Sequence, residues 1–126
     1  MSIILDAGAL LAVERGDDYI VAVIRRELAQ RRPPRSHGGV IGQVWRGGGA
    51  RQARLARVLP GIAIVPLDDA LGRRAGALLA RARKSDVVDA ALVLLAEDGD
   101  RIFTSDPDDL TPLAHAAGLQ VDIVPV

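Results

Sequence analysis

Short apolar runs alternate along this chain with longer stretches in which apolar residues recur at helical spacing. Four of the runs have the length and apolar content of buried strands, at residues 2–5, 62–67, 101–104 and 121–124. Helices are expected between and beside them, at residues 7–15, 17–32, 38–49, 50–59, 68–83, 86–97 and 106–118. Strands that alternate with helices form a parallel sheet, because each helix carries the chain back to the same end of the sheet.

The length of 126 residues suits one domain with a core of its own. A parallel sheet needs helices on both faces, since its strands are apolar on both sides. We therefore predict a single α/β domain over residues 1–126. Its architecture is a three-layer α/β/α sandwich with a central, mostly parallel sheet of four to five strands.

Composition excludes several classes of protein. The chain has no cysteine, so it holds no disulfide, thiolate nucleophile or Cys-ligated zinc. With one Trp, one Tyr and one Phe it lacks the residues for an aromatic platform that stacks single-stranded bases. The longest apolar run, residues 90–96, is far shorter than the ~20 residues of a membrane span. No basic segment precedes the first apolar run, so we expect no signal peptide, no membrane association and a soluble, cytoplasmic protein.

The formal net charge of zero hides a separation of charge along the chain. Residues 1–24 carry one Arg and four acids, and residues 85–126 carry one Arg and nine acids. The segment between them carries 13 Arg and one Lys against three acids. Three of these arginines (Arg51, Arg54 and Arg57) recur on one helical face, which is either solvated or free to contact phosphates.

Four aspartates are expected at one edge of the sheet. Asp6 directly follows the first strand, and Asp106 follows the strand at 101–104. Asp86 and Asp89 lie three residues apart at the start of the most apolar helix, on one face of it. Ligands of parallel sheets bind beyond the carboxyl ends of the strands, so these carboxylates are expected to converge on one cleft.

Each of these acids also has a simpler interpretation. Asp6 can cap the helix that follows it, and Asp106 with Asp109 has the spacing of a capping box around Pro107. Ser85 can cap the next helix, where Asp86 suits the positive end of the helix dipole. Two observations favour a site: Asp89 precedes an apolar run, where an unpaired carboxylate is costly, and few cations follow residue 83.

A cluster of unpaired carboxylates is best explained by a hard cation with oxygen ligands, Mg²⁺ or Mn²⁺. Such an ion polarises a phosphoryl oxygen and lowers the pKa of a bound water, which supplies hydroxide for attack on a phosphodiester. The predicted chemistry is therefore metal-assisted hydrolysis. His37 and His115 are far apart in sequence and are expected to have packing or surface roles. Trp45, the sole Trp, is expected to pack or to form a dimer contact.

Four segments resemble PIN-domain ribonucleases, especially the VapC-type toxins of bacterial toxin–antitoxin pairs. They are residues 5–11 (Leu-Asp-Ala-Gly-Ala-Leu-Leu), 43–48 (Gln-Val-Trp-Arg-Gly-Gly), 86–90 (Asp-Val-Val-Asp-Ala) and 104–110 (Thr-Ser-Asp-Pro-Asp-Asp-Leu). The resemblance spans nearly the whole chain and keeps the order and spacing of the motifs. It implies a PIN-like fold and a metal-dependent endoribonuclease that cleaves RNA.

The resemblance also implies a site and partners. Asp6, Asp89 and Asp106 would surround Mg²⁺ or Mn²⁺, with Asp86 and Asp109 as additional acids. The implied assembly is a homodimer whose cleft is blocked by a small cognate antitoxin. One position departs from the family pattern, because Gln43 stands where the family usually has Glu. An amide oxygen coordinates a metal without supplying charge. The alternative is therefore a PIN-like RNA- or partner-binding module with weak or no catalysis.

Overall fold

The computed structural model describes residues 1–126. Its centre is a sheet of five parallel strands in the order β3-β2-β1-β4-β5. The strands are β1 (Ile3–Leu5), β2 (Arg35–His37), β3 (Ala63–Val65), β4 (Arg101–Thr104) and β5 (Asp122–Pro125). The predicted α/β class and the parallel sheet are therefore confirmed, with the strand number at the upper end of the expected range.

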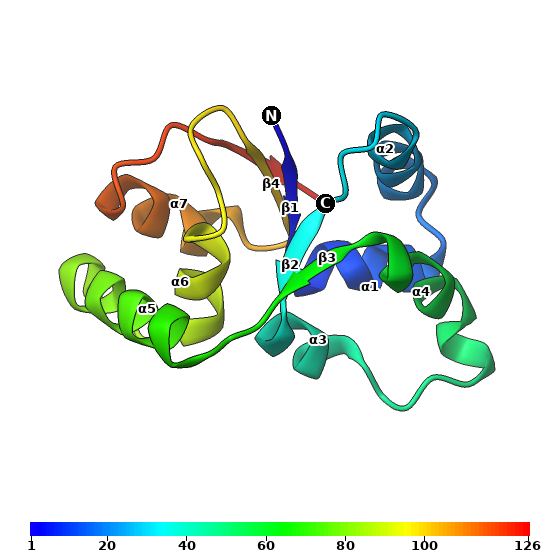
Figure 1. Cartoon of the computed structure of the whole chain (residues 1–126), viewed down its shortest axis with the longest axis horizontal. Helices are drawn as coiled ribbons and strands as arrows, with labels where there is room; N and C mark the ends of the chain where they lie inside the picture. The colour runs from blue at the N-terminus through cyan, green and yellow to red at the C-terminus, as the bar shows by residue number, and fades with distance from the viewer.

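Seven helices cover the sheet. They are α1 (Ala7–Arg15), α2 (Asp18–Ala29), α3 (Gly38–Val44), α4 (Ala53–Val58), α5 (Asp69–Ala82), α6 (Val87–Val93) and α7 (Pro107–Ala116), with single 3₁₀ turns at Ala50–Gln52 and Leu59–Gly61. Figure 1 shows α1, α2 and α4 to one side of the strands, and α5, α6 and α7 to the other. This arrangement confirms the three-layer α/β/α sandwich. None of the helices combines the length and the apolar character that a membrane span requires.

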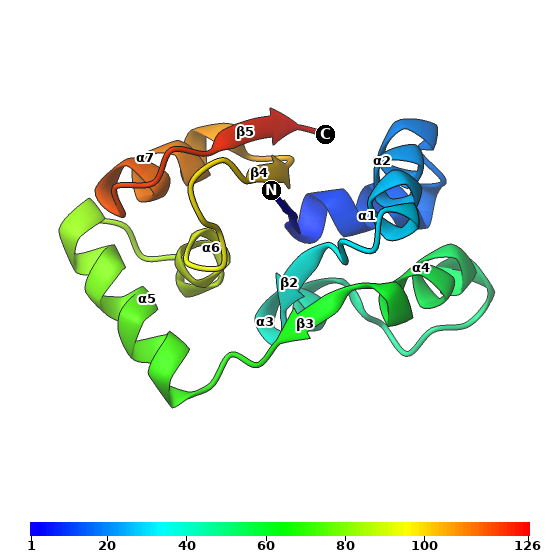
Figure 2. The same ribbon diagram turned by 45° about the horizontal axis from the view of Figure 1, so that its top comes forward.

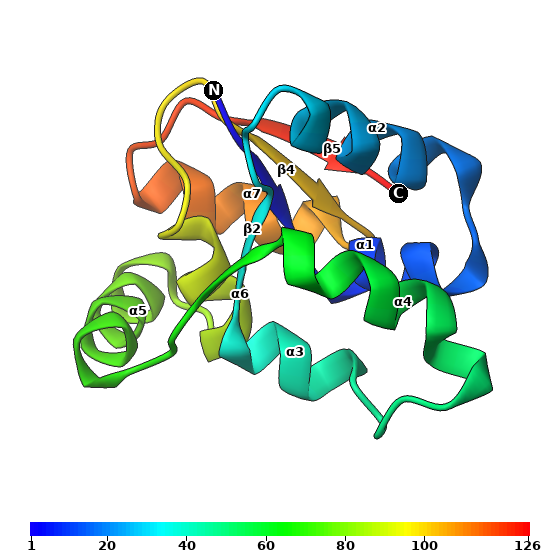
Figure 3. The same ribbon diagram turned by 45° about the vertical axis from the view of Figure 1, so that its right-hand side comes forward.

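Helices within each outer layer contact one another as well as the sheet. Figure 2 shows α6 beside both α5 and α7. Figure 3 shows α1 alongside α4 in the opposite layer, with α3 below them. The apolar side chains between the layers form one core cluster, in which the three residues of β1 are at most 1% exposed. The central position of β1 explains why its sequence is apolar on both faces.

Strand β2 was not among the predicted strands. Its residues Arg35, Ser36 and His37 are polar, and the prediction relied on apolar runs. In the sheet the strand lies between β1 and β3, and its central Ser36 is fully buried. The Ser36 hydroxyl donates to the carbonyl of Leu5 at 2.8 Å, so the polar group that lowers the strand's apolar content has a partner in the neighbouring strand.

Several predicted helices are shorter in the structure than in the sequence analysis. The helix expected at 38–49 ends at Val44, because the backbone of Trp45 is extended. The helix does not resume before residue 50, since Gly47, Gly48 and Gly49 all have φ between 81° and 88°. The helix expected at 86–97 ends at Val93. The one expected at 50–59 is a 3₁₀ turn followed by the short α4.

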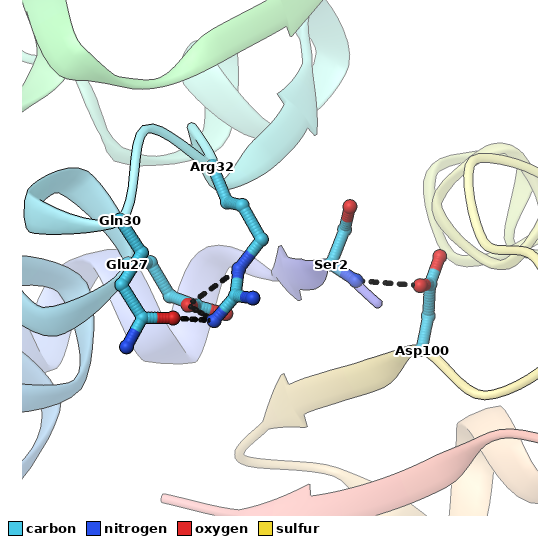
Figure 4. Close-up of polar contacts among 5 residues, drawn as sticks. All are labelled: Ser2, Glu27, Gln30, Arg32 and Asp100. Atoms are coloured by element: carbon cyan, nitrogen blue, oxygen red, sulfur yellow. Dashed lines mark hydrogen bonds and ion pairs between the residues drawn. The ribbon is translucent and has the colours of Figure 1, made fainter.

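Figure 4 shows two separate groups of polar contacts, one between Ser2 and Asp100 and one at the end of α2. The buried Asp100 accepts hydrogen bonds from the backbone N–H groups of Ser2 at 2.7 Å and Glu97 at 2.9 Å. On α2, the buried Glu27 pairs with Arg32 at 2.9 Å, and Arg32 also donates to Gln30. Both buried carboxylates are thus satisfied by donors.

The chain reverses direction across the sheet between β1 and β4. From β1 the chain proceeds outward through β2 to β3, then returns to β4 on the other side of β1 and continues to β5. Such a reversal is a topological switch point, where the loops after the two strands diverge and leave room for a ligand. Asp6 follows β1 and Asp106 closely follows β4, so both lie at this point.

Candidate metal site

One pocket of about 280 Å³ opens at the carboxyl edge of β1 and β4. All six residues singled out in the sequence line it: Asp6, Gln43, Asp86, Asp89, Asp106 and Asp109. They come from the ends of β1 and β4, from α3, and from the first turns of α6 and α7. The topology of the sheet therefore brings together side chains that are up to 103 positions apart in sequence. We call this cavity the acidic pocket.

Asp6 is the most buried acid of the pocket, with 7% of its surface exposed. Its carboxylate caps α1 by accepting a hydrogen bond from the Ala9 N–H at 2.8 Å. Burial raises the pKa of Asp6 above its usual value, and the nearby Asp106 adds to the effect. Asp6 thus combines the predicted helix cap with a place in the acidic pocket.

Asp89 is half-buried in the first turn of α6. Burial is the largest of the causes that raise the pKa of Asp89 to about 6, and repulsion by neighbouring acids adds to it. These neighbours are Asp86, Asp109, Asp6 and Asp106. The Asp89 carboxylate is therefore close enough to the other four to be repelled by each of them.

Asp86 lies outside the helix that was predicted to contain it. It is the N-cap of α6, and its carboxylate accepts from the Asp89 N–H at 3.1 Å. The prediction that Ser85 caps this helix is therefore wrong, because the cap lies one residue later. Asp86 is exposed and remains part of the pocket lining.

The predicted capping box at the start of α7 is not formed by the Asp106 side chain. Asp106 occupies the N-cap position, yet its carboxylate makes no capping hydrogen bond. It accepts a long bond of 3.4 Å from the Ser105 hydroxyl instead, while the Thr104 hydroxyl accepts from the Asp106 N–H at 2.8 Å. Its carboxylate and that of Asp109 are both exposed at the pocket.

Gln43 is exposed on α3 and lines the acidic pocket opposite these acids. It is the one neutral side chain at a position where a carboxylate was expected. Its amide oxygen is an uncharged candidate ligand, and its NH₂ group is a donor toward a phosphate or water.

No carboxylate of the acidic pocket takes part in an ion pair within the chain. The two ion pairs of the protein join Arg32 to Glu27 and Arg73 to Asp69, and neither touches the pocket. No three acidic or histidine side chains lie close enough to form a complete ligand cage. Mg²⁺ commonly binds through one or two carboxylates and keeps several waters. The chemistry of these donors therefore suits a hydrated Mg²⁺ or Mn²⁺ bound by one or two of the carboxylates and by several waters.

His37 contacts the helix that carries Asp89, and this contact was not expected from the sequence. The side chain is fully buried at the end of β2, and burial lowers its pKa. Nδ1 accepts from the Gly39 N–H at 3.0 Å, so Nε2 carries the proton and donates to the Val88 carbonyl at 2.9 Å. His37 thus ties β2 to the turn of α6 that carries Asp89. Its neighbours Ser36 and Gly38 gave no sequence signal for this contact.

The fold and the pocket together define an α/β protein with a carboxylate-lined cavity at the switch point of a parallel sheet. No protein-family model matches the chain, and no curated protein matches it.

Proposed function

We propose that the protein is a metal-dependent endoribonuclease that acts in the cytoplasm as the toxin of a toxin–antitoxin pair. The observation that carries the proposal is the convergence of five carboxylates, without a cation partner, on the pocket between β1 and β4. Oxygen-rich, uncompensated sites of this kind suit Mg²⁺ or Mn²⁺. The resemblance of four sequence segments to PIN-domain ribonucleases supports RNA as the substrate and the toxin role.

In this proposal Asp6, Asp89 and Asp106 surround a hydrated ion, which one or two of them bind directly and the rest through water. Asp86, Asp109 and Gln43 lie around them. When bound, the ion supplies the Lewis acidity that activates water and neutralises charge on the phosphodiester. Asp6 is fixed by its bond to the Ala9 N–H, and Asp89 lies in a turn held by Asp86 and, through Val88, by His37. The acids are thereby positioned before the ion arrives.

The resemblance further supports a homodimer and a small antitoxin that covers the acidic pocket.

We expect expression of the wild-type protein to arrest growth and expression of Asp89→Asn not to do so. Size-exclusion chromatography with light scattering is expected to give twice the 13.3 kDa chain mass.

A test uses purified protein, a structured RNA, and Mg²⁺, Mn²⁺ or EDTA. We expect cleavage with either metal, none with EDTA, and none by Asp6→Asn or Asp89→Asn. Asp98→Asn is the matched control, because Asp98 is an exposed acid that lines no pocket. Equal cleavage by every variant would identify a contaminant and contradict the proposal, as would absence of cleavage with every metal.

A second candidate function rests on Gln43. A PIN-like module that binds RNA or a protein partner with weak or no catalysis requires the same pocket but not a full set of charged ligands. Metal-dependent binding without turnover by the wild-type protein is the result expected of this alternative.

A further inference from the structure

A cavity with a positively charged lining lies between α2 and α4, which Figure 1 shows on the other side of the strands from α6. Its volume is about 470 Å³. None of its lining residues lines the acidic pocket. We call it the arginine pocket, because its lining has three guanidiniums and one carboxylate. The lining residues are Gly16, Asp18, Val21, Arg25, Arg54 and Arg57.

Helix α1 separates the arginine pocket from the acidic pocket. Asp6, the N-cap of α1, belongs to the acidic pocket, whereas Gly16, its C-cap, lines the arginine pocket. A helix of nine residues is about 14 Å long. Charges in salt solution act weakly on each other beyond about 8 Å, so the two pockets are electrostatically distinct.

The arginine pocket is formed by the facing surfaces of two helices. Arg54 and Arg57 lie three residues apart, on one face of α4. The fully buried Leu55 anchors this short helix in the core. Val21 and Arg25 lie four residues apart on α2 and likewise share a face. Three guanidiniums from two helices therefore converge on one cavity.

Two close contacts hold the walls of the arginine pocket. A Cβ on Gly16 would stand 3.0 Å from both Cζ and Nε of Arg54, so this guanidinium lies directly against the backbone. The φ of Gly16 is 79°, which favours glycine at this position. In the turn after α4, a Cβ on Gly61 would stand 3.2 Å from two carbons of Leu28 on α2. The first contact orients Arg54, and the second joins the end of α4 to α2.

The three arginines of the pocket are exposed and have no anionic partner. None of them takes part in either ion pair of the protein. Nor does any of their guanidiniums donate a hydrogen bond within the chain. The lining therefore carries an excess of two positive charges, which repel one another until an anion is bound.

The acids near the pocket do not neutralise it. Glu14 and Asp17 flank Gly16 in sequence, but both are engaged elsewhere. The Glu14 carboxylate accepts from the Gln52 amide at 2.6 Å, and that of Asp17 accepts from the first turn of α2 at 2.9 Å. Asp18 lines the pocket and forms no ion pair with any of its arginines.

We propose that the arginine pocket binds a small anion with two or more linked phosphates, either free or as the phosphate chain of a nucleotide. A guanidinium presents donors in a fork that matches phosphate oxygens. Three guanidiniums around one cavity suit charge that is concentrated in one place. A polynucleotide backbone instead carries one charge per phosphate, spread along the strand. The inference does not rest on the proposed nuclease function.

Isothermal titration in EDTA tests the site, because without a metal ion the carboxylates of the acidic pocket repel phosphates. The ligands are orthophosphate, pyrophosphate and tripolyphosphate. We expect one tripolyphosphate per chain, bound about tenfold more tightly than orthophosphate, because it reaches more guanidiniums. ADP and GDP distinguish the two sources of the ligand. Tighter binding than that of pyrophosphate identifies a nucleotide, and equal or weaker binding identifies free polyphosphate.

Four substitutions locate the binding site. Arg25→Ala, Arg54→Ala and Arg57→Ala are each expected to weaken tripolyphosphate binding about tenfold, because each removes one charge-assisted contact. Asp18→Asn is expected to bind it more tightly than the wild type, because a like charge is removed. Since a misfolded protein does not gain affinity, this variant keeps the test decisive if an arginine variant fails to fold.

Arg51→Ala is the matched control. Arg51 is an exposed arginine three residues before Arg54, and it does not line the arginine pocket. Its substitution is expected to leave tripolyphosphate binding nearly unchanged. Asp89→Asn is also expected to bind as the wild type does, since Asp89 belongs to the acidic pocket.

The site would be overturned by absence of binding of all three phosphate ligands, or by equal affinity for orthophosphate and tripolyphosphate. An equal loss on Arg51→Ala and Arg54→Ala would also overturn it, because binding would then reflect the general positive charge of this surface. Tighter binding of a poly-glutamate peptide, or of an oligoribonucleotide without terminal phosphates, would overturn it in favour of a macromolecular partner.

Discussion

Gly8 lies so close to Ser105 that a Cβ on Gly8 would stand 2.2 Å from the Ser105 Oγ and 2.5 Å from its Cβ. This contact joins the first turn of α1 to the turn that follows β4. Asp6 lies two residues before Gly8, and Asp106 directly follows Ser105. The absence of a side chain at position 8 therefore sets how closely these two carboxylates approach each other.

Gly8→Ala is expected to lower the free energy of unfolding by about 1–3 kcal/mol, because the added methyl overpacks the contact. It should also weaken Mg²⁺ binding by displacing Asp106. Chemical denaturation and isothermal titration with Mg²⁺ measure the two effects. Gly76→Ala on α5 is the matched control: its Cβ would meet nothing within 4 Å, so Ala should raise stability by up to about 1 kcal/mol. Equal effects of the two substitutions would contradict a steric role for Gly8.

Asp89→Asn is expected to stabilise the metal-free protein above pH 6. The pKa of Asp89 is about 6 in the folded protein and close to 3.8 when unfolded. The protonated carboxyl therefore favours the folded state below about pH 4, and this contribution is lost as pH rises through 6. Allowing for solvent screening of a half-buried group, the loss is about 1 kcal/mol. The wild-type stability should fall over this window, and that of Asp89→Asn should fall less.

Thermal melts between pH 4 and pH 8 with EDTA measure this difference. Added Mg²⁺ should raise the melting temperature of the wild type at pH 7.5, more so than at pH 5, because a cation binds the ionised carboxylates. It should leave Asp89→Asn nearly unchanged. A large destabilisation of the metal-free Asp89→Asn variant would show that the carboxylate holds the fold together.

Asp100, unlike Asp89, is expected to stabilise the fold. Its buried carboxylate accepts hydrogen bonds from the N–H groups of two backbone segments. Asp100→Asn replaces one acceptor with an NH₂ donor that faces a backbone N–H, so it should cost about 1–3 kcal/mol of stability. Asp98→Asn is the control: the Asp98 carboxylate accepts one bond, from the Gln120 N–H at 2.9 Å, which an amide oxygen can also accept. Urea denaturation compares the two, and a smaller loss for Asp100→Asn would refute this account.

Much of the fold could be predicted from the sequence because the buried strands are apolar on both faces. The strand at 101–104 and the helix at 7–15 have the bounds expected of them. Strand β2 could not be found this way: its polar groups are satisfied by tertiary partners, such as the Leu5 carbonyl for Ser36, that a local pattern does not encode.

The clustering of the acids was predictable for a related reason. Carboxylates that directly follow parallel strands must share an edge of the sheet, whatever the side-chain details. Those details did escape prediction, because Ser85 and Asp86 are both good capping residues and only the backbone path decides between them. The place of Gln43 was expected only from the resemblance and not from the topology, since α3 is positioned by the unpredicted β2.

Gln43→Glu tests whether the uncharged amide limits the site. A sixth carboxylate beside the other five should raise Mg²⁺ affinity through its charge, while the metal-free protein should lose stability because like charges repel. Isothermal titration and melts with EDTA measure these opposite effects, and Gln30→Glu on the exposed end of α2 is the control expected to change neither. Greater RNA cleavage by Gln43→Glu is the result expected if the wild-type site is attenuated. Unchanged Mg²⁺ affinity would show that residue 43 does not contact the ion.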